Sequence, residues 1–185
     1  MHEPAPDVEL LRAAFRHLHG AHLHGFALVL VLGDRQLAAH LATEALAAIS
    51  VDAPRLRHPE RAAATLRAHV VNLARRQRPR PALDDERATT LTHLGLDRLA
   101  AAALGRLTLV DRAALLGGQI EGFAEDDLAT ILHTTPGRAR RAQMDARHRY
   151  LAEHFAEPAA LDDQLGGIAE RVRDTAARTM GNVTH

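Results

Sequence analysis

The sequence predicts an all-α protein, and three observations indicate this fold class. Apolar residues make up 46% of the chain and are mostly Ala and Leu, which lose little free energy in a helix. Aromatic residues, which favour strands, contribute only 3%. Apolar side chains also recur at spacings of three and four residues, the period of a helix face. We therefore expect amphipathic helices throughout.

The first 33 residues predict two helices. The first has Asp7 as its N-cap and an apolar stripe of Val8, Leu11, Phe15 and Leu18. Gly20 and Gly25 interrupt the helical pattern in the stretch that follows. Residues 26–32 are continuously apolar and predict a buried helix, which Gly33 closes.

Two more helices are expected before residue 77. Asp34 can cap a helix whose apolar stripe is Leu37, Leu41, Ala45 and Ile49. Residues 50–59 form a loop, and Pro59 suits the first turn of the next helix. That helix runs to Arg76 with a stripe of Leu66, Val70 and Leu73.

Residues 77–90 are the best linker candidate, because they combine prolines with dense charge and show no apolar period. Helical patterning resumes with Leu94, Leu99, Ala103 and Leu107, and another helix covers residues 110–119. A last amphipathic helix is expected over residues 159–179, with a stripe of Leu161, Leu165, Ile168 and Val172. We expect it to pack on its own domain. The predicted organisation is a helical module at 1–76, a linker at 77–93, a second module at 94–155 and a tail at 156–185.

Composition narrows the classes of function. The chain has no Cys, which excludes disulfides and thiolate metal sites. The longest apolar run is too short to span a bilayer and the N-terminus lacks a signal pattern, so we expect a cytoplasmic protein without membrane contact. No nucleophile elbow, phosphate-binding glycine loop or metalloprotease spacing is present. We expect no catalytic residues, no cofactor and no enzymatic activity.

Charge is spread unevenly along a chain of zero formal net charge. Residues 53–80 contain eight Arg and one acid, whereas residues 1–52 contain six acids and three Arg. Such a basic block is typical of a surface that binds a polyanion. A solvated helix face with a basic linker explains it equally well.

Residues 122–147 read GFAEDDLATILHTTPGRARRAQMDAR and predict a helix-turn-helix. Leu128, Ile131 and Leu132 form the apolar stripe of the first helix, and three acids occupy its first turn, where the helix dipole favours them. His133 to Thr135 form the turn, which lacks the glycine common in such turns. Histidine tolerates the left-handed conformation at modest cost, so His133 can take the place of the glycine.

The second helix of this motif is expected to begin at Pro136 with Thr135 as its N-cap. Its thin buried face comprises Ala139, Ala142, Ala146 and Tyr150. Arg138, Arg140 and Arg141 lie away from that face, near the helix start, where a recognition helix meets phosphates and base edges. A helical hairpin with an arginine-rich surface is the alternative explanation.

Two other clusters invite a chemical interpretation. His17, His19, His22 and His24 have no carboxylate or Cys beside them and fit no standard metal spacing, so we expect no metal site. Asp84, Asp85 and Glu86 lie in the expected linker without a convergent base. We interpret them as a solvated charge run.

Three segments, in order and spacing, resemble sigma-70 family factors of the extracytoplasmic-function type. FALVLVLGDRQLAAHLATEALAAI and HPERAAATLRAHVVNLARRQRPR resemble region 2. LGRLTLVDRAALLGGQIEGFAEDDLATILHTTPGRARRA resembles region 4. The similarity covers roughly residues 15–80 and 98–150.

The resemblance implies a region 2-like module and a region 4-like module that bind promoter DNA and core RNA polymerase. Region 2 would bind the β′ clamp helices and melt the −10 element, and region 4 would bind the −35 element and the β flap. An anti-sigma protein is a further partner that the resemblance leaves open. The implied polymerase-binding residues are Asp34, Leu41 and Glu44. The implied DNA-binding residues are Asn72, Arg75, Arg76 and Arg78 for the −10 element, and Thr135, Gly137, Arg138, Arg140 and Arg141 for the −35 element.

The chain departs from the family pattern at the two surfaces that matter for initiation. Ala39, His40 and Thr43 replace acidic and polar residues of the polymerase contact. Ala64, Thr65 and Gln77 lie where aromatic residues usually stack on unpaired bases, a contact worth about 1–3 kcal/mol per base. Two functions therefore stay open: an initiation factor, or a degenerate sigma-like regulator that binds a partner without melting a promoter.

Overall fold

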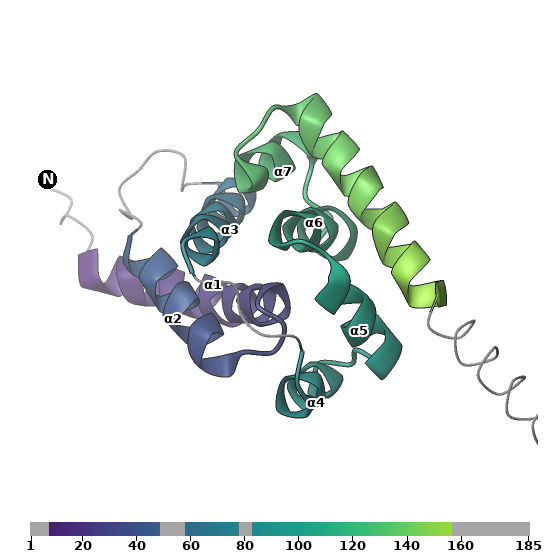
Figure 1. Cartoon of the computed structure of the whole chain (residues 1–185). Helices are drawn as coiled ribbons and strands as arrows, with labels where there is room; N and C mark the ends of the chain where they lie inside the picture. The colour runs from purple at the N-terminus through teal and green to yellow at the C-terminus, as the bar shows by residue number, and fades with distance from the viewer. Residues whose placement is uncertain (1–7, 49–57, 78–82, 157–185) are drawn as a thin grey trace, which may run out of the picture.

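The computed structural model describes residues 8–48, 58–77 and 83–156, and these ranges contain helices but no strand (Figure 1). The all-α prediction is confirmed. In chain order the elements are α1 (Val8–Leu30), α2 (Arg35–Ala47), α3 (Pro59–Arg75), α4 (Asp85–His93), α5 (Arg98–Arg106), α6 (Leu109–Leu115), the π-helical turn η2 (Leu116–Ile120), α7 (Glu125–Leu132) and a final helix over residues 136–156.

The two helices expected in the first 33 residues are one continuous helix, α1, which passes through Gly20 and Gly25. A glycine inside a helix costs about 1 kcal/mol relative to Ala. Burial offsets this cost, because Leu23, Phe26 and Leu30 enter the core against α2 and α3. Asp7, the expected N-cap, lies outside the described residues.

The turn between α1 and α2 requires a glycine. Gly33 has φ of +80°, and its amide donates to the Leu28 carbonyl at 2.8 Å. An added Cβ would collide with the Arg87 carbonyl oxygen of α4. Asp34 then caps α2 as predicted, its carboxylate accepting from the Leu37 amide at 2.8 Å.

The helices α2 and α3 follow their predicted patterns with small changes. Leu37, Leu41 and Ala45 are buried along α2, while Ile49 lies outside the described residues. Pro59 occupies the first turn of α3, as expected. The buried stripe of α3 is Leu66, Val70, Val71 and Ala74, and Leu73 is only half-buried.

The segment expected to be a linker contains a helix, α4, that its composition did not predict. Asp84 is the N-cap and accepts from the Arg87 amide at 2.9 Å, and Asp85 and Glu86 follow in the first turn. The acidic run interpreted as solvated charge therefore starts this helix, because carboxylates stabilise helix N-termini. Leu94, expected to start the next helix, instead ends α4.

The helix expected over residues 110–119 is present as α6 followed by η2. Thr108 caps α6 by accepting from the Asp111 amide at 3.2 Å. Gly117 allows η2 to approach α7, because a Cβ there would lie 3.0 Å from Leu128. Close approach of this kind requires a small residue at that position.

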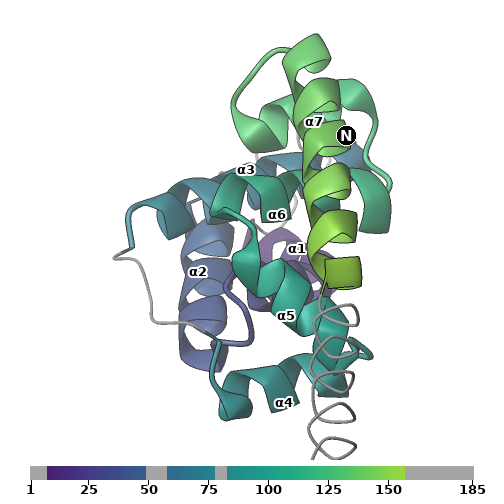
Figure 2. The same cartoon turned by 45° about the vertical axis from the view of Figure 1, so that its right-hand side comes forward.

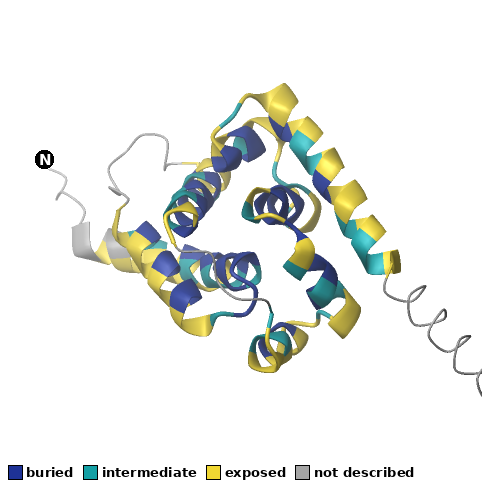
Figure 3. Cartoon of the chain, viewed as in Figure 1, coloured by how far each residue is buried: buried dark blue, intermediate teal, exposed yellow. Residues whose placement is uncertain are grey.

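Buried side chains from both expected modules form one cluster, which extends from Leu23 to Ala146. The two expected modules meet where α3 packs along α7 and where α1 contacts α6 (Figures 1 and 3). In this structure the two expected modules are therefore packed together. Their separation into two tethered domains stays a prediction.

Candidate nucleic-acid interface

The turn between α7 and the final helix is built around a left-handed residue. His133 caps the C-terminus of α7 with φ 54° and ψ 51°, the left-handed conformation expected for a turn without glycine. The Thr134 amide donates to the Ala129 carbonyl at 3.0 Å and closes the turn. The His133 ring lies 3.3 Å from the Ala68 carbonyl of α3, which also holds it in place.

The second helix begins at Pro136 as predicted, with the Thr135 carbonyl accepting from the Ala139 amide at 2.9 Å. Ala139 and Ala146 are fully buried, and Ala142 and Tyr150 pack partly against the core. Small residues on this face let the helix lie close to the core.

Arg138, Arg140 and Arg141 are exposed at the N-terminal end of this helix, together with Gly137 and Thr135. Within the described part of the chain, these three guanidinium groups pair with no carboxylate. We call them the arginine trio. Their charge adds to the positive end of the helix dipole, which favours an anion such as a phosphate.

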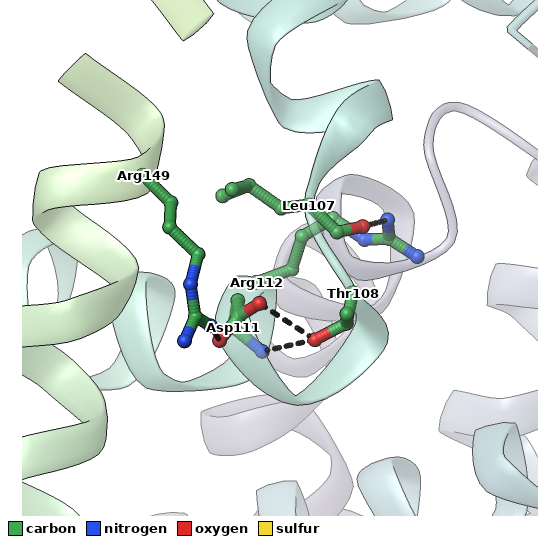
Figure 4. Close-up of polar contacts among 5 residues, drawn as sticks. All are labelled: Leu107, Thr108, Asp111, Arg112 and Arg149. Carbon is green, nitrogen blue, oxygen red and sulfur yellow. Dashed lines mark hydrogen bonds and ion pairs between the residues drawn. The ribbon is translucent and has the colours of Figure 1, made fainter. Parts of the chain in front are cut away.

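Polar contacts in the C-terminal half of this helix fix its direction (Figure 4), and Figure 2 shows the helix running past α6 and α5. Arg149 binds Asp111 at 2.5 Å, and the Thr108 hydroxyl donates to the same carboxylate at 2.8 Å. Arg106 and Glu153 form a second, more exposed pair at 2.9 Å. The arginine trio is thus presented by a helix that is anchored to the N-terminus of α6.

The residues of α3 that were expected to read the −10 element lie in different environments. Arg75 and Arg76 are exposed at the C-terminal end, and Arg75 donates to the Leu132 carbonyl of α7 at 3.5 Å. Ala64 is fully buried in the core. Arg78 lies outside the described residues.

Asn72 lies in a groove of about 570 Å³ between α3 and α7. The groove places the expected −10 surface beside the turn of the helix-turn-helix, two features that the sequence assigned to separate modules. Its polar lining is Thr65, His69 and Asn72 from α3, and Asp126, Thr130, His133 and Thr134 from the α7 side. The signal for the α3 side was available, because Thr65, His69 and Asn72 share one face by their spacing of four and three.

The residues expected to bind polymerase differ in their accessibility. Glu44 is exposed on α2, together with Ala39, His40 and Thr43. Asp34 is half-buried and caps α2. Leu41 is fully buried in the core, so in this structure it packs the helix and presents no surface.

Three arginines that were not expected as site residues make contacts across long stretches of the sequence: Arg67 and Arg112 join the two expected modules, and Arg87 joins the expected linker to the first module. Arg112 is buried and donates to the Leu30 carbonyl at 2.8 Å and the Leu107 carbonyl at 2.6 Å. Desolvation lowers the pKa of Arg112 to about 10, with Arg87 adding to the effect, so the group is still charged at neutral pH. Arg87 donates to the carbonyls of Leu32 and Val31, both at 2.9 Å.

The third of these arginines is Arg67 of α3, which forms a bidentate ion pair with Glu121 at the end of η2. Its guanidinium also lies over the rings of Phe26 and Phe123, at 5.6 and 5.1 Å from their centroids. Arg67 belongs to the basic block of residues 53–80, yet it is buried and paired. That block is therefore not uniformly available to a polyanion.

The histidines of α1 lie in different environments. His19 is buried against Phe15, with ring centroids 4.5 Å apart, whereas His17 and His22 are exposed. In the described ranges no three His, Asp or Glu side chains gather as a metal site would require. Nor does any helix in those ranges have the length and hydropathy needed to cross a bilayer.

Comparison with known proteins gives no match: no protein-family model, no curated protein and no solved structure matches this chain.

Proposed function

We propose that this chain is a transcription initiation factor of the extracytoplasmic-function type that acts without catalysis. The observation that supports this most is the arginine trio, which faces solvent at the start of the second helix of a helix-turn-helix. Arginine at this position of a recognition helix contacts phosphates and the edges of guanine. The helix 136–156 would therefore bind the −35 element.

The remaining proposed contacts, with the −10 element and with polymerase, use exposed residues of other helices. Arg75 and Arg76, at the end of α3, would contact the backbone of the −10 element. Glu44 on α2 would contact the β′ clamp helices of core RNA polymerase, and the module around α7 would contact the β flap. An anti-sigma protein is the class of regulator that such a factor would have.

A second candidate is a sigma-like regulator that binds a partner and does not melt a promoter. Two observations favour it: Asn72 faces the groove beside α7, and Leu41 is enclosed in the core. In this structure, part of the surface expected to melt DNA and part of the surface expected to bind polymerase are therefore enclosed by the protein itself. Binding of duplex DNA by the arginine trio is compatible with both candidates.

The arginine trio is tested by DNA binding, first at one salt concentration and then over a series of salt concentrations. The probe is a duplex selected from a randomised pool by the unmodified protein. R138A and R141A should each weaken binding by about 1–3 kcal/mol if the contact is bidentate to guanine, and a lost phosphate contact should lower the salt dependence by about one unit of slope. The control is R98A, which removes an exposed arginine from the start of α5. Equal affinity of R138A, R141A and R98A would refute the assignment.

Run-off transcription with core polymerase separates the two candidates. Transcripts from a template that carries the selected duplex support the initiation factor. Stable binding of DNA or polymerase subunits without transcripts supports the regulator. In the first case E44A should reduce both co-purification of polymerase and transcript yield, while duplex binding stays unchanged.

A further inference from the structure

The helices α3 and α7 lie side by side and run in the same direction (Figures 1 and 2). Near their N-terminal ends, residues 58–61 of α3 and Asp127 of α7 line one groove. At the other end, Arg75 of α3 donates to the carbonyl of Leu132, the last residue of α7, at 3.5 Å. The C-terminal end of α3 therefore lies against the turn that leads into the final helix.

Charge is divided between the two ends of this pair of helices. Where the N-terminal ends meet, the groove lining contains one arginine, Arg61, and three acids. The acids are Glu60, Asp126 and Asp127. At the opposite end Arg75 and Arg76 are exposed, and the arginine trio follows the turn. A polyanion is therefore attracted to the C-terminal end of the pair and repelled by the other.

The arginines at this end lie close enough together to contact one stretch of DNA. Arg75 reaches Leu132, and Arg138 follows Leu132 by six residues, at most about 22 Å of extended chain. Arg141 lies three residues further, about 5 Å along the helix axis. These spans are shorter than one turn of B-DNA, about 34 Å. We call Arg75, Arg76 and the arginine trio the five-arginine surface.

The two promoter elements are much further apart than these arginines. The −10 and −35 elements are separated by about 25 bp, or about 85 Å of B-DNA at 3.4 Å per base pair. The described residues, which do not include the helix expected over residues 159–179, share one core. A compact body of that number of residues is roughly 40 Å across. In the packed structure, the two sets of arginines therefore do not reach separate elements of one straight promoter.

We propose that the five-arginine surface binds the phosphate backbone of a single duplex segment, about one helical turn long. The choice of DNA as the ligand rests on the proposed function. The inference adds that the arginines of α3 and those of the final helix act on the same segment. Phosphate contacts do not depend on base sequence, so the number of contacts sets the salt dependence of binding to any duplex.

The test measures binding to two mixed-sequence duplexes, of about 14 and about 40 bp, by fluorescence anisotropy over a series of salt concentrations. R75A/R76A removes the α3 part of the surface, and R138A/R141A removes most of the other part. R76A alone keeps the contact of Arg75 with α7, so it separates charge from packing. R61A is the matched control, because it makes the same substitution in the same helix at the acidic end. Circular dichroism checks the folding of each variant.

On the short duplex, R75A/R76A and R138A/R141A should each lower the salt slope by about two units and the affinity by at least about tenfold at about 0.1 M salt. R76A should lower the slope by about one unit, and R61A should match the unmodified protein. Equal slopes for R75A/R76A and R61A on the short duplex would overturn the proposal, as would losses confined to the long duplex. If R138A/R141A still weakens binding in that case, the arginine trio binds DNA alone, so the inference fails while the proposed function stands.

Discussion

At the scale of the residue, His133 shows how a side chain replaces the glycine expected in the turn. Its backbone is left-handed, and its ring reaches the Ala68 carbonyl of α3. For a residue other than glycine, this backbone conformation costs about 1–2 kcal/mol of stability. The contact with α3 gives a reason for a histidine at a position where glycine would be less strained.

Substitution of His133 separates the backbone cost from the ring contact. Both H133N and H133V lose the ring that lies 3.3 Å from Ala68, but only asparagine tolerates a positive φ. We expect H133V to be less stable than H133N by about 1–2 kcal/mol in urea unfolding. Equal stability of the two variants would mean that the turn relaxes to another conformation.

His19 predicts a dependence of stability on pH. Burial lowers the pKa of His19 from its usual 6.5, and the nearby charges of Arg67 and His22 lower it further. The neutral ring is thus the stable form in the folded protein. Stability from this group is complete above pH 6.5 and is lost as the pH falls below 6.5 toward the lower pKa of the folded state.

The variant H19Q removes this titration from a chain with thirteen histidines. Between pH 7.5 and pH 5.5 the urea midpoint of the unmodified protein should fall further than that of H19Q. The difference between the two proteins isolates the contribution of His19. Parallel curves would show that its pKa is the same in the folded and unfolded states.

At the scale of the element, the sequence predicted helix starts better than helix continuity. Asp34, Pro59 and Pro136 begin helices where expected, because caps and first-turn prolines act through neighbouring backbone groups. The continuity of α1 through Gly20 and Gly25 depends on packing against α2 and α3. A local pattern does not contain that tertiary contribution.

Two glycines of the α1–α2 hairpin should respond to substitution with opposite signs. G33A forces a side chain into the positive-φ region and against the backbone of Arg87, which should cost about 2 kcal/mol or more. G25A places its Cβ in open space within α1 and should stabilise by about 1 kcal/mol. Thermal unfolding of both variants beside the unmodified protein measures the two effects. Destabilisation by G25A would contradict the continuous helix.

At the scale of the whole molecule, side chains far apart in sequence join the two halves. The buried stripes of α2 and α7 and the arginine trio could be predicted from the sequence, because they follow the helical period. The same period placed Leu18 and Leu99 in apolar stripes, but both side chains are exposed. The long-range partners of three arginines, Glu121 for Arg67, Leu32 for Arg87 and Leu30 for Arg112, could not be predicted, because they lie between 54 and 82 residues away. The groove around Asn72 was missed for the same reason, since α7 forms its other wall.

The shared core predicts a single cooperative unfolding transition. Far-UV circular dichroism reports all helices, and the fluorescence of Tyr150, the one tyrosine of the chain, reports the final helix. The two signals should give the same urea midpoint. Two separate transitions would show that the halves fold independently, as tethered domains do.

The Arg67–Glu121 pair is the sharpest test of this coupling. The Arg67 side chain is 5% exposed and Glu121 is 21% exposed, so E121Q leaves a nearly buried guanidinium without its counter-ion. Removing one partner of a buried pair costs about 3 kcal/mol. E153Q is the matched control, because it breaks the exposed Arg106–Glu153 pair, whose contribution is about 0.5 kcal/mol. E121Q should lower the midpoints seen by both probes together. A shift in circular dichroism alone would mean that the pair stabilises the N-terminal helices without joining them to the helix that carries the arginine trio.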